Sequence, residues 1–158
     1  MNLVSRDEQL LGRAIELSQQ ARSAGNQPFG SLLVDAGGEI LAQDVNTEIT
    51  DNDITAHPEL KLARWAGANL SEDEASKSSM YTSCEACAMC SGAIVTSGLG
   101  RVVFALSTPQ LLELKGGSTP RAMRGVDVLA GAEQHIVVEG PFLYEQAAAP
   151  HAGYWHQA

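Results

Sequence analysis

The chain has 158 residues, enough for one domain with a sizeable core and too few for two domains of ordinary size. Hydrophobic residues make up 44% and charged residues 18% of it, which is typical of a globular protein and excludes a disordered one. The formal net charge is −9, and the ten lysines and arginines are scattered. Both features disfavour a protein that binds nucleic-acid phosphates and favour a small, neutral or weakly charged substrate.

The same composition bears on location and redox state. The first 20 residues carry charges throughout and lack the apolar core of a signal peptide, and no run of about 18 apolar residues could span a membrane. The three cysteines all fall between Cys84 and Cys90, so a disulfide framework is not expected. We therefore expect a soluble, cytoplasmic protein with reduced thiols.

In chain order, the hydrophobic pattern predicts alternating helices and strands. Apolar residues at three- and four-residue steps predict a helix over 7–24, and two apolar runs around Gly37-Gly38 predict a hairpin over 29–46. The later elements are a helix (57–70), a polar connector (71–79), a strand (80–83), a helix (84–98), a strand (101–106), a short helix and loop (107–125), one or two extended runs (126–138) and a helix starting near Gly140-Pro141. This order predicts a single α/β domain over 1–158, with helices on both faces of a sheet.

The cysteines at 84, 87 and 90 are open to several interpretations. An iron–sulfur cubane needs four thiolates, and the chain has only three. A thioredoxin-like dithiol would place Cys84 and Cys87 at the start of a helix, which the predicted helix allows. Plain packing suits Cys90 best. The remaining interpretation is a metal site, and it requires a further ligand.

His57 supplies that ligand. It stands at the predicted start of a helix, a boundary that Pro58 supports because proline is tolerated in a first helical turn. Two helix N-termini would then meet, and their dipoles favour the thiolate form that binds metals. Cys84 and Cys87, three residues apart, would face the same way. His57, Cys84 and Cys87 are therefore the predicted zinc ligands, with the fourth position left to water.

Glu59 lies two residues after His57, where a first-turn side chain can reach the same site. Zinc can lower the pKa of bound water from about 15.7 to about 7, and a nearby carboxylate can move the released proton. Glu59 is therefore the predicted proton shuttle. The alternative is a solvated carboxylate that only favours the helix dipole.

His-x-Glu followed by Cys-x-x-Cys is the signature of the zinc-dependent nucleobase deaminases. The stretches "PFGSLLV", "NDITAHPELKLAR", "YTSCEACAMCSGAI" and "SGLGRVVFAL" resemble the branch of bacterial guanine deaminases and tRNA adenosine deaminases. The resemblance implies a cytidine deaminase-like fold, a three-layer α/β/α sandwich with a central mixed five-stranded sheet. It also implies a Zn²⁺ cofactor and a hydrolytic deaminase acting on an amidine-type C–N bond.

The resemblance also assigns substrate contacts. Asn46 matches the residue whose amide holds the base, Phe29 matches an aromatic that packs on it, and the backbone around Ala56 and Ser83 lines the same site. Cys90 matches a cysteine that is read as structural. This chain departs from the usual pattern at Pro58, where alanine is usual, and at Ala86, where proline is usual; neither change removes a ligand.

For the substrate, we expect a free purine-type base, guanine first, because "YTSCEAC" resembles the guanine deaminase motif. A nucleoside, pterin or triazine amine, a tRNA adenosine, and a non-catalytic zinc-stabilised module remain alternatives. The tail, 147–158, is expected to cover the active site, with Trp155 as a contact, and a homodimer is expected from the resemblance. Guanine deaminases also use an acidic residue after the last strands, for which this chain offers three counterparts: Glu113, Glu139 and Glu145.

Overall fold

The computed structural model describes residues 3–117 and 123–156. Its centre is a five-stranded sheet with the order β2-β1-β3-β4-β5. The strands are β1 (Gly30–Val34), β2 (Ile40–Val45), β3 (Ser79–Cys84), β4 (Arg101–Leu106) and β5 (Val137–Glu139). β1 pairs antiparallel with β2 and β3, whereas β3, β4 and β5 run parallel. The predicted mixed five-stranded sheet is confirmed.

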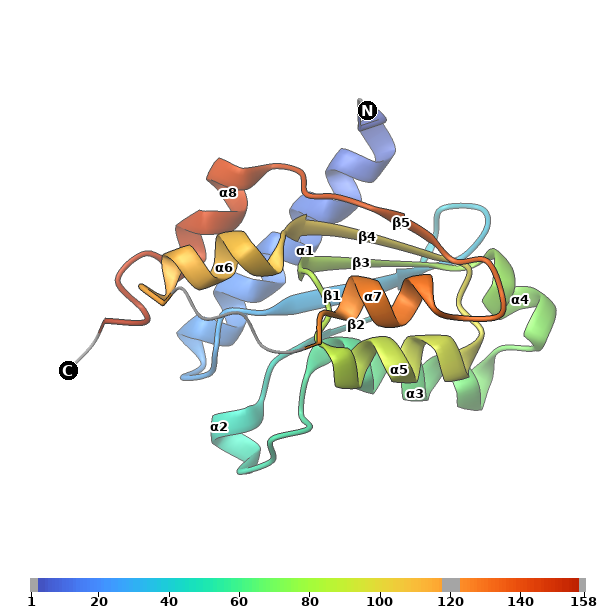
Figure 1. Ribbon diagram of the computed structural model, residues 1–158, viewed down its shortest axis with the longest axis horizontal. Coiled ribbons are helices and arrows are strands. Elements are labelled where there is room, and N and C mark those ends of the chain that lie inside the picture. Colours follow the sequence, from blue (N-terminus) through green and yellow to red (C-terminus); the bar gives the residue numbers. More distant parts are fainter. Residues whose placement is uncertain (1–2, 118–122, 157–158) are drawn as a thin grey trace.

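Helices cover both faces of this sheet (Figure 1). They are α1 (Ser5–Ser23), α2 (Glu48–Asp51), α3 (Pro58–Asn69), α4 (Glu72–Lys77), α5 (Ala88–Ser97), α6 (Thr108–Leu114), α7 (Gly125–Ala130) and α8 (Tyr144–Ala148), followed by a 3-10 turn, η1 (Ala149–His151). α1, α6 and α8 pack on one face, and α3, α5 and α7 pack on the other. Within the described ranges, none of these helices has the length and apolar character needed to cross a bilayer.

The two faces have separate apolar cores because neighbouring strand residues point in opposite directions. Leu32 and Tyr81 join the core beneath α1, whereas Leu33 and Met80, their neighbours in sequence, join the core beneath α3 and α5. All four side chains are buried. The three central strands, β1, β3 and β4, are buried on both faces, as expected for the centre of a three-layer sandwich.

One glycine brings β1 against α1. A Cβ atom on Gly30 would lie 2.5 Å from the Cβ of Leu17 and 2.6 Å from the backbone nitrogen of Ser18, so only glycine fits. The backbone N–H of Gly30 donates to Ser83 Oγ at 3.1 Å. This close approach places the start of β1 next to the end of β3.

Three sequence-based boundaries differ from the structure. The helix expected to begin at Cys84 begins at Ala88, because β3 continues through Cys84. The stretch 126–130 is helical, although extended runs were predicted over 126–138. The polar connector 71–79 contains α4, which a capping box between Ser71 and Glu74 stabilises.

The last helix also begins later than its glycine–proline signal indicated. Gly140-Pro141 is a cis peptide, and α8 starts at Tyr144. The chain then turns through η1 toward the end of α6, where Lys115 Nζ lies 4.1 Å from the centre of the Trp155 ring (Figure 1).

Candidate active site

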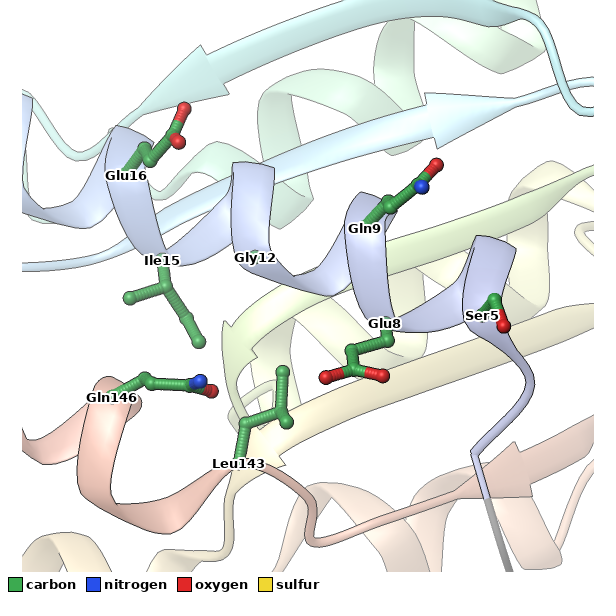
Figure 2. A pocket seen from close by; sticks show the side chains of 8 residues that line it. All are labelled: Ser5, Glu8, Gln9, Gly12, Ile15, Glu16, Leu143 and Gln146. Carbon is green, nitrogen blue, oxygen red and sulfur yellow. The ribbon is translucent and has the colours of Figure 1, made fainter.

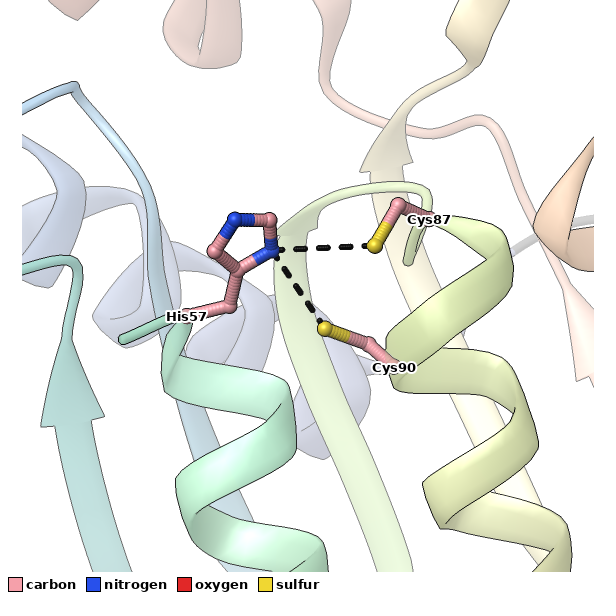
Figure 3. Close-up of side chains that lie close together, drawn as sticks. All are labelled: His57, Cys87 and Cys90. Carbon is pink, nitrogen blue, oxygen red and sulfur yellow. Dashed lines mark hydrogen bonds between the residues drawn. The ribbon is translucent and has the colours of Figure 1, made fainter. Parts of the chain in front are cut away.

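Two helix N-termini meet beside the sheet, as the sequence predicts. His57 is the N-cap of α3 and Cys87 is the N-cap of α5; each has an extended backbone conformation. The two helices pack side by side over the same sheet face. The first-turn residues of both helices therefore point toward a shared space (Figure 3).

Within that space the structure gathers His57, Cys87 and Cys90. Nδ1 of His57 lies 3.6 Å from Sγ of Cys87 and 3.4 Å from Sγ of Cys90. The three donor atoms all lie within 4.8 Å of one another. One nitrogen and two sulfur donors are a set that zinc prefers in a tetrahedral site, and three ligands leave one position open. The residues present therefore fit the zinc ion.

Cys84, a predicted ligand, is not part of this group, and its assignment is wrong. Cys84 is the last residue of β3, and its side chain packs in the core beneath α1, on the opposite sheet face from Cys90. Because α5 starts after Cys87, the pair that lies one helical turn apart is Cys87 and Cys90. Cys90, which the resemblance made structural, takes the place of Cys84.

The two cysteine thiols of the group differ in pKa. Hydrogen bonding from Cys90 lowers the pKa of the Cys87 thiol to about 4, with further stabilisation from His57. The shared hydrogen bond with Cys87, together with burial, raises the pKa of Cys90. Before metal binding, the pair thus holds one thiolate, on Cys87. Burial raises the pKa of Cys84 well above its ordinary value, which leaves that thiol neutral.

Glu59 is buried at the back of the same space, with only 5% of its surface exposed. Its Oε1 lies 2.9 Å from Ser31 Oγ and 2.7 Å from Thr82 Oγ1. These two hydroxyls lie 2.8 Å from each other. Burial raises the pKa of the carboxyl group, while the Thr82 hydroxyl opposes that rise. The carboxyl group is therefore held in one orientation and disposed to take up a proton.

Ser31 and Thr82 were missed by the sequence analysis. A serine and a threonine inside predicted strands carry no signal, since the same residues are common in strands without a catalytic neighbour. Only the antiparallel pairing of β1 with β3, which sets Ser31 opposite Thr82, brings both hydroxyls to Glu59.

The residues expected to contact substrate lie around this centre. Asn46 is buried at the end of β2, where its Nδ2 donates to Glu48 Oε2 at 2.8 Å. Ala56 is buried, and its carbonyl accepts from the N–H of Thr47 at 3.1 Å. Ser83 is buried beside the start of β1, where its hydroxyl accepts from Gly30.

Phe29 and Trp155 meet in an aromatic cluster formed with the C-terminal tail. The Phe29 ring centroid lies 6.1 Å from that of Trp155 and 5.5 Å from that of His151. Trp155 Nε1 donates to His151 Nδ1 at 3.1 Å. Burial lowers the pKa of His151 to about 4. His151 was missed because a histidine in an alanine-rich tail belongs to no recognisable motif.

Two carboxylates missed by the sequence analysis also border the site. Glu48 Oε2 lies 3.4 Å from His57 Nε2. Glu85 is buried directly before the cysteine turn, where it accepts from the N–H of Thr108 at 2.9 Å and from Arg124 Nη2 at 2.6 Å. Of the acids expected from the resemblance, Glu139 is paired with Arg101 at 2.6 Å.

A separate pocket of about 510 Å³ lies between α1 and α8 (Figure 2). Ile15 and Leu143 form its apolar part, and Glu8 and Glu16 stand on its rim. None of the three metal-binding side chains lines it. It is therefore distinct from the site at α3 and α5.

Comparison with known proteins accounts for this geometry. Residues 4–106 match the family model of the cytidine and deoxycytidylate deaminase zinc-binding region. The chain is 37% identical to a probable cytosine deaminase of Schizosaccharomyces pombe over 97% of this chain and 94% of that protein. It is 32% identical to a tRNA-specific adenosine deaminase of Bacillus subtilis over 87% of this chain and 81% of that protein.

A solved structure of a mutant protein in complex with 8-azaguanine has the same fold. The two share 25% identity and a TM-score of 0.80, with 94% of this chain and 83% of that chain covered. The family match, the relatives, the fold and the three metal-binding side chains all agree. The chain belongs to the cytidine and deoxycytidylate deaminase family and is a zinc-dependent hydrolytic deaminase.

Proposed function

We propose that this deaminase acts on a free nucleobase, with guanine, converted to xanthine and ammonia, as the first candidate. The observation that carries this proposal is the aromatic cluster of Phe29, His151 and Trp155. In this proposal the tail, described as far as residue 156, covers the site with flat, mostly apolar side chains. A small planar base suits such an enclosure better than a folded RNA does.

The wall of the site supports the same substrate class. In this proposal the Asn46 amide holds the base, the Phe29 ring packs on it, and Trp155 closes over it. Backbone groups of Ala56 and Ser83 complete the wall, and all of these residues except Phe29 and Trp155 are buried. Recognition would thus rest on one amide, a few backbone groups and ring stacking.

His57, Cys87 and Cys90 would hold the zinc ion, which would supply the Lewis acid that makes water nucleophilic enough to attack the amino-bearing ring carbon. Glu59 is the proposed proton shuttle. It carries one proton from the attacking water to a ring nitrogen and then the remaining hydroxyl proton to the amino group, so that the C–N bond breaks and ammonia leaves. Ser31 and Thr82 hold Oε1 of Glu59, which leaves Oε2 for this transfer. Because Glu59 is buried, it gains its proton from the reacting groups instead of bulk solvent.

Cytosine is the second candidate, because the similarity to the probable cytosine deaminase extends over nearly the whole of both chains. The 8-azaguanine complex, a purine analogue bound by the same fold, supports guanine. A tRNA substrate finds less support, since a net charge of −9 opposes binding to phosphates. We also propose that the chain is one deaminase domain and acts as a cytoplasmic homodimer.

An ammonia-release screen tests the substrate. The zinc-loaded protein is incubated with guanine, guanosine, cytosine, cytidine, adenosine, a pterin and a triazine amine, with an anticodon stem-loop assayed separately. We expect turnover of a free base. Turnover of only the stem-loop, with binding that weakens steeply as salt rises, would overturn the proposal.

A substitution in the aromatic cluster tests the role of the tail. Trp155→Ala should raise KM for the base identified by the screen, whereas Tyr144→Ala, at an exposed position on α8, should not. Equal KM values for both variants would show that the tail does not cover the site.

A further inference from the structure

The side chain of Glu48 lies between a zinc-binding residue and the amide assigned to the base. Its Oε2 is 3.4 Å from Nε2 of His57 and accepts from Nδ2 of Asn46 at 2.8 Å. The backbone N–H of Glu48 donates to Oδ1 of the same asparagine at 3.0 Å. One carboxylate oxygen therefore contacts both parts of the site.

The orientation of the His57 ring explains how Glu48 can act on it. Nδ1 faces the two sulfurs, and Figure 3 shows the second ring nitrogen pointing away from them. An imidazole that binds a metal through Nδ1 carries its hydrogen on Nε2 and needs an acceptor there to fix the tautomer and the ring plane. Glu48 Oε2 is placed to be that acceptor.

Hydrogen bonds fix the backbone on both sides of Glu48. The buried side chain of Asn26 accepts at 3.1 Å from the N–H groups of both Ile49 and Thr50, the residues that follow Glu48. On the other side, Lys61 Nζ donates to the carbonyl of Val45 at 2.7 Å. α2 is therefore a fixed support, although it has only four residues.

Burial strengthens the interaction. The Glu48 side chain is 18% exposed and that of His57 is 24% exposed, so water screens the contact less than it would at the surface. Asp51, on the same short helix, is exposed and serves as a matched control.

We propose that Glu48 is a positioning residue that orients His57 toward the cysteine pair and holds the Asn46 amide at the same time. Loss of its carboxylate should then weaken zinc binding and substrate binding together. The first effect is independent of the substrate, whereas the second rests on the proposed function.

The experiment measures zinc affinity by competition with a chromophoric chelator in Glu48→Ala, Glu48→Gln and Asp51→Asn. Outer carboxylates of this kind contribute about 10–100-fold to metal affinity, so we expect a loss in that range for Glu48→Ala. Glu48→Gln keeps an oxygen acceptor and should lose less, and Asp51→Asn should match the unmodified protein. An affinity for Glu48→Ala within threefold of the unmodified protein would refute the proposal.

Two further measurements separate positioning from a general loss of structure. Thermal unfolding of the metal-free proteins should give similar Tm values for Glu48→Ala and Asp51→Asn. If Glu48→Ala has a much lower Tm, and this loss of stability explains its whole loss of zinc affinity, the proposal is also refuted. KM for the base from the screen should rise in Glu48→Ala. If no base is turned over, the proposed substrate fails, but the zinc affinities still decide the role of Glu48 toward His57.

Discussion

The sulfur of Cys90, on the buried face of α5, lies 3.4 Å from Nδ1 of His57, at the start of α3. The two residues are 33 positions apart in the chain. A metal held between them links two helices that pack on the same face of the sheet. The site is thus a tertiary cross-link as well as a place for chemistry.

The choice between the cysteines is tested by two substitutions. Cys90→Ser should lower zinc affinity by more than about 100-fold, because loss of a direct ligand exceeds the loss expected for an outer residue. Cys84→Ser should retain zinc and only destabilise the core. Metal content per chain after dialysis distinguishes them, and a zinc-free Cys84→Ser that is still folded would contradict the assignment.

Removal of the metal should loosen the packing of α3 on α5. Saturation at about 1,000 times Kd adds about 4 kcal/mol to the free energy of unfolding, so Tm should fall on chelation and recover on adding zinc. Thermal unfolding with and without chelator measures this. The chelator should leave the Tm of Cys90→Ser nearly unchanged, and an equal shift in that variant would argue against the cross-link.

Glu59→Gln should lower kcat by about 10²–10⁴-fold, the range typical of a lost general acid–base group. Glutamine keeps an oxygen that can accept from Ser31 and Thr82, so the fold should be preserved. The control is zinc content, which should stay at one ion per chain. If this variant binds zinc and releases ammonia at the normal rate, Glu59 is not the proton shuttle.

The hydroxyl pair that holds Glu59 should affect turnover more than binding. Ser31→Ala removes one hydrogen bond to the carboxyl group, and we expect kcat to fall about tenfold, equivalent to about 1.4 kcal/mol. KM should change little, and Ser76→Ala, on the exposed side of α4, should have no effect. A changed KM with normal kcat would place Ser31 in substrate binding instead.

His151 should make folding stability depend on pH. Burial lowers its pKa to about 4, against about 6.5 in an unfolded chain, and the charges of Lys115 and Arg22 act in the same direction. Between these values the unfolded chain binds a proton that the folded protein does not. The free energy of unfolding should therefore fall as pH decreases from about 6.5 toward 4, by up to about 1.4 kcal/mol per pH unit.

Urea unfolding of the metal-free protein at several pH values measures this dependence. The comparison with His151→Gln cancels the contribution of groups common to both proteins, such as the Asp7–Arg101 pair at 2.8 Å. The variant should lose less stability on acidification. Parallel curves for the two proteins would show that His151 does not contribute.

Much of the fold could be predicted from the sequence, because hydrophobic periodicity and the glycine and proline residues at the ends of helices and strands are local signals. Pro58 marked the start of α3, and Gly37-Gly38 marked the hairpin between β1 and β2. The last third was predicted less well. The stretch 126–130 is helical, and Gly125 at its start lies so close to the turn before α5 that a Cβ there would be 1.8 Å from the Ala86 carbonyl oxygen.

The spacing of the cysteines does not by itself identify which two of them bind the metal. Cys84, Cys87 and Cys90 are evenly spaced, so the choice of pair depended on where the strand ended and the helix began. A difference of four residues in that boundary moved the ligand pair by one cysteine. Glu48 could not be predicted at all, because its role depends on the position of α2 beside His57.

The buried carboxylate of Glu85 has a consequence for building hybrid enzymes. It joins the turn before Cys87 to Thr108 and Arg124, and thus forms a polar joint between the last third of the chain and the metal-binding part. A chimera that exchanges residues 107–158 for those of a relative, and keeps a donor for Glu85, should retain zinc binding and the proposed base contacts of the first two thirds of the chain, and take from the relative the tail that carries Trp155. The metal-binding part and the tail would then be separable modules that recombine at this joint.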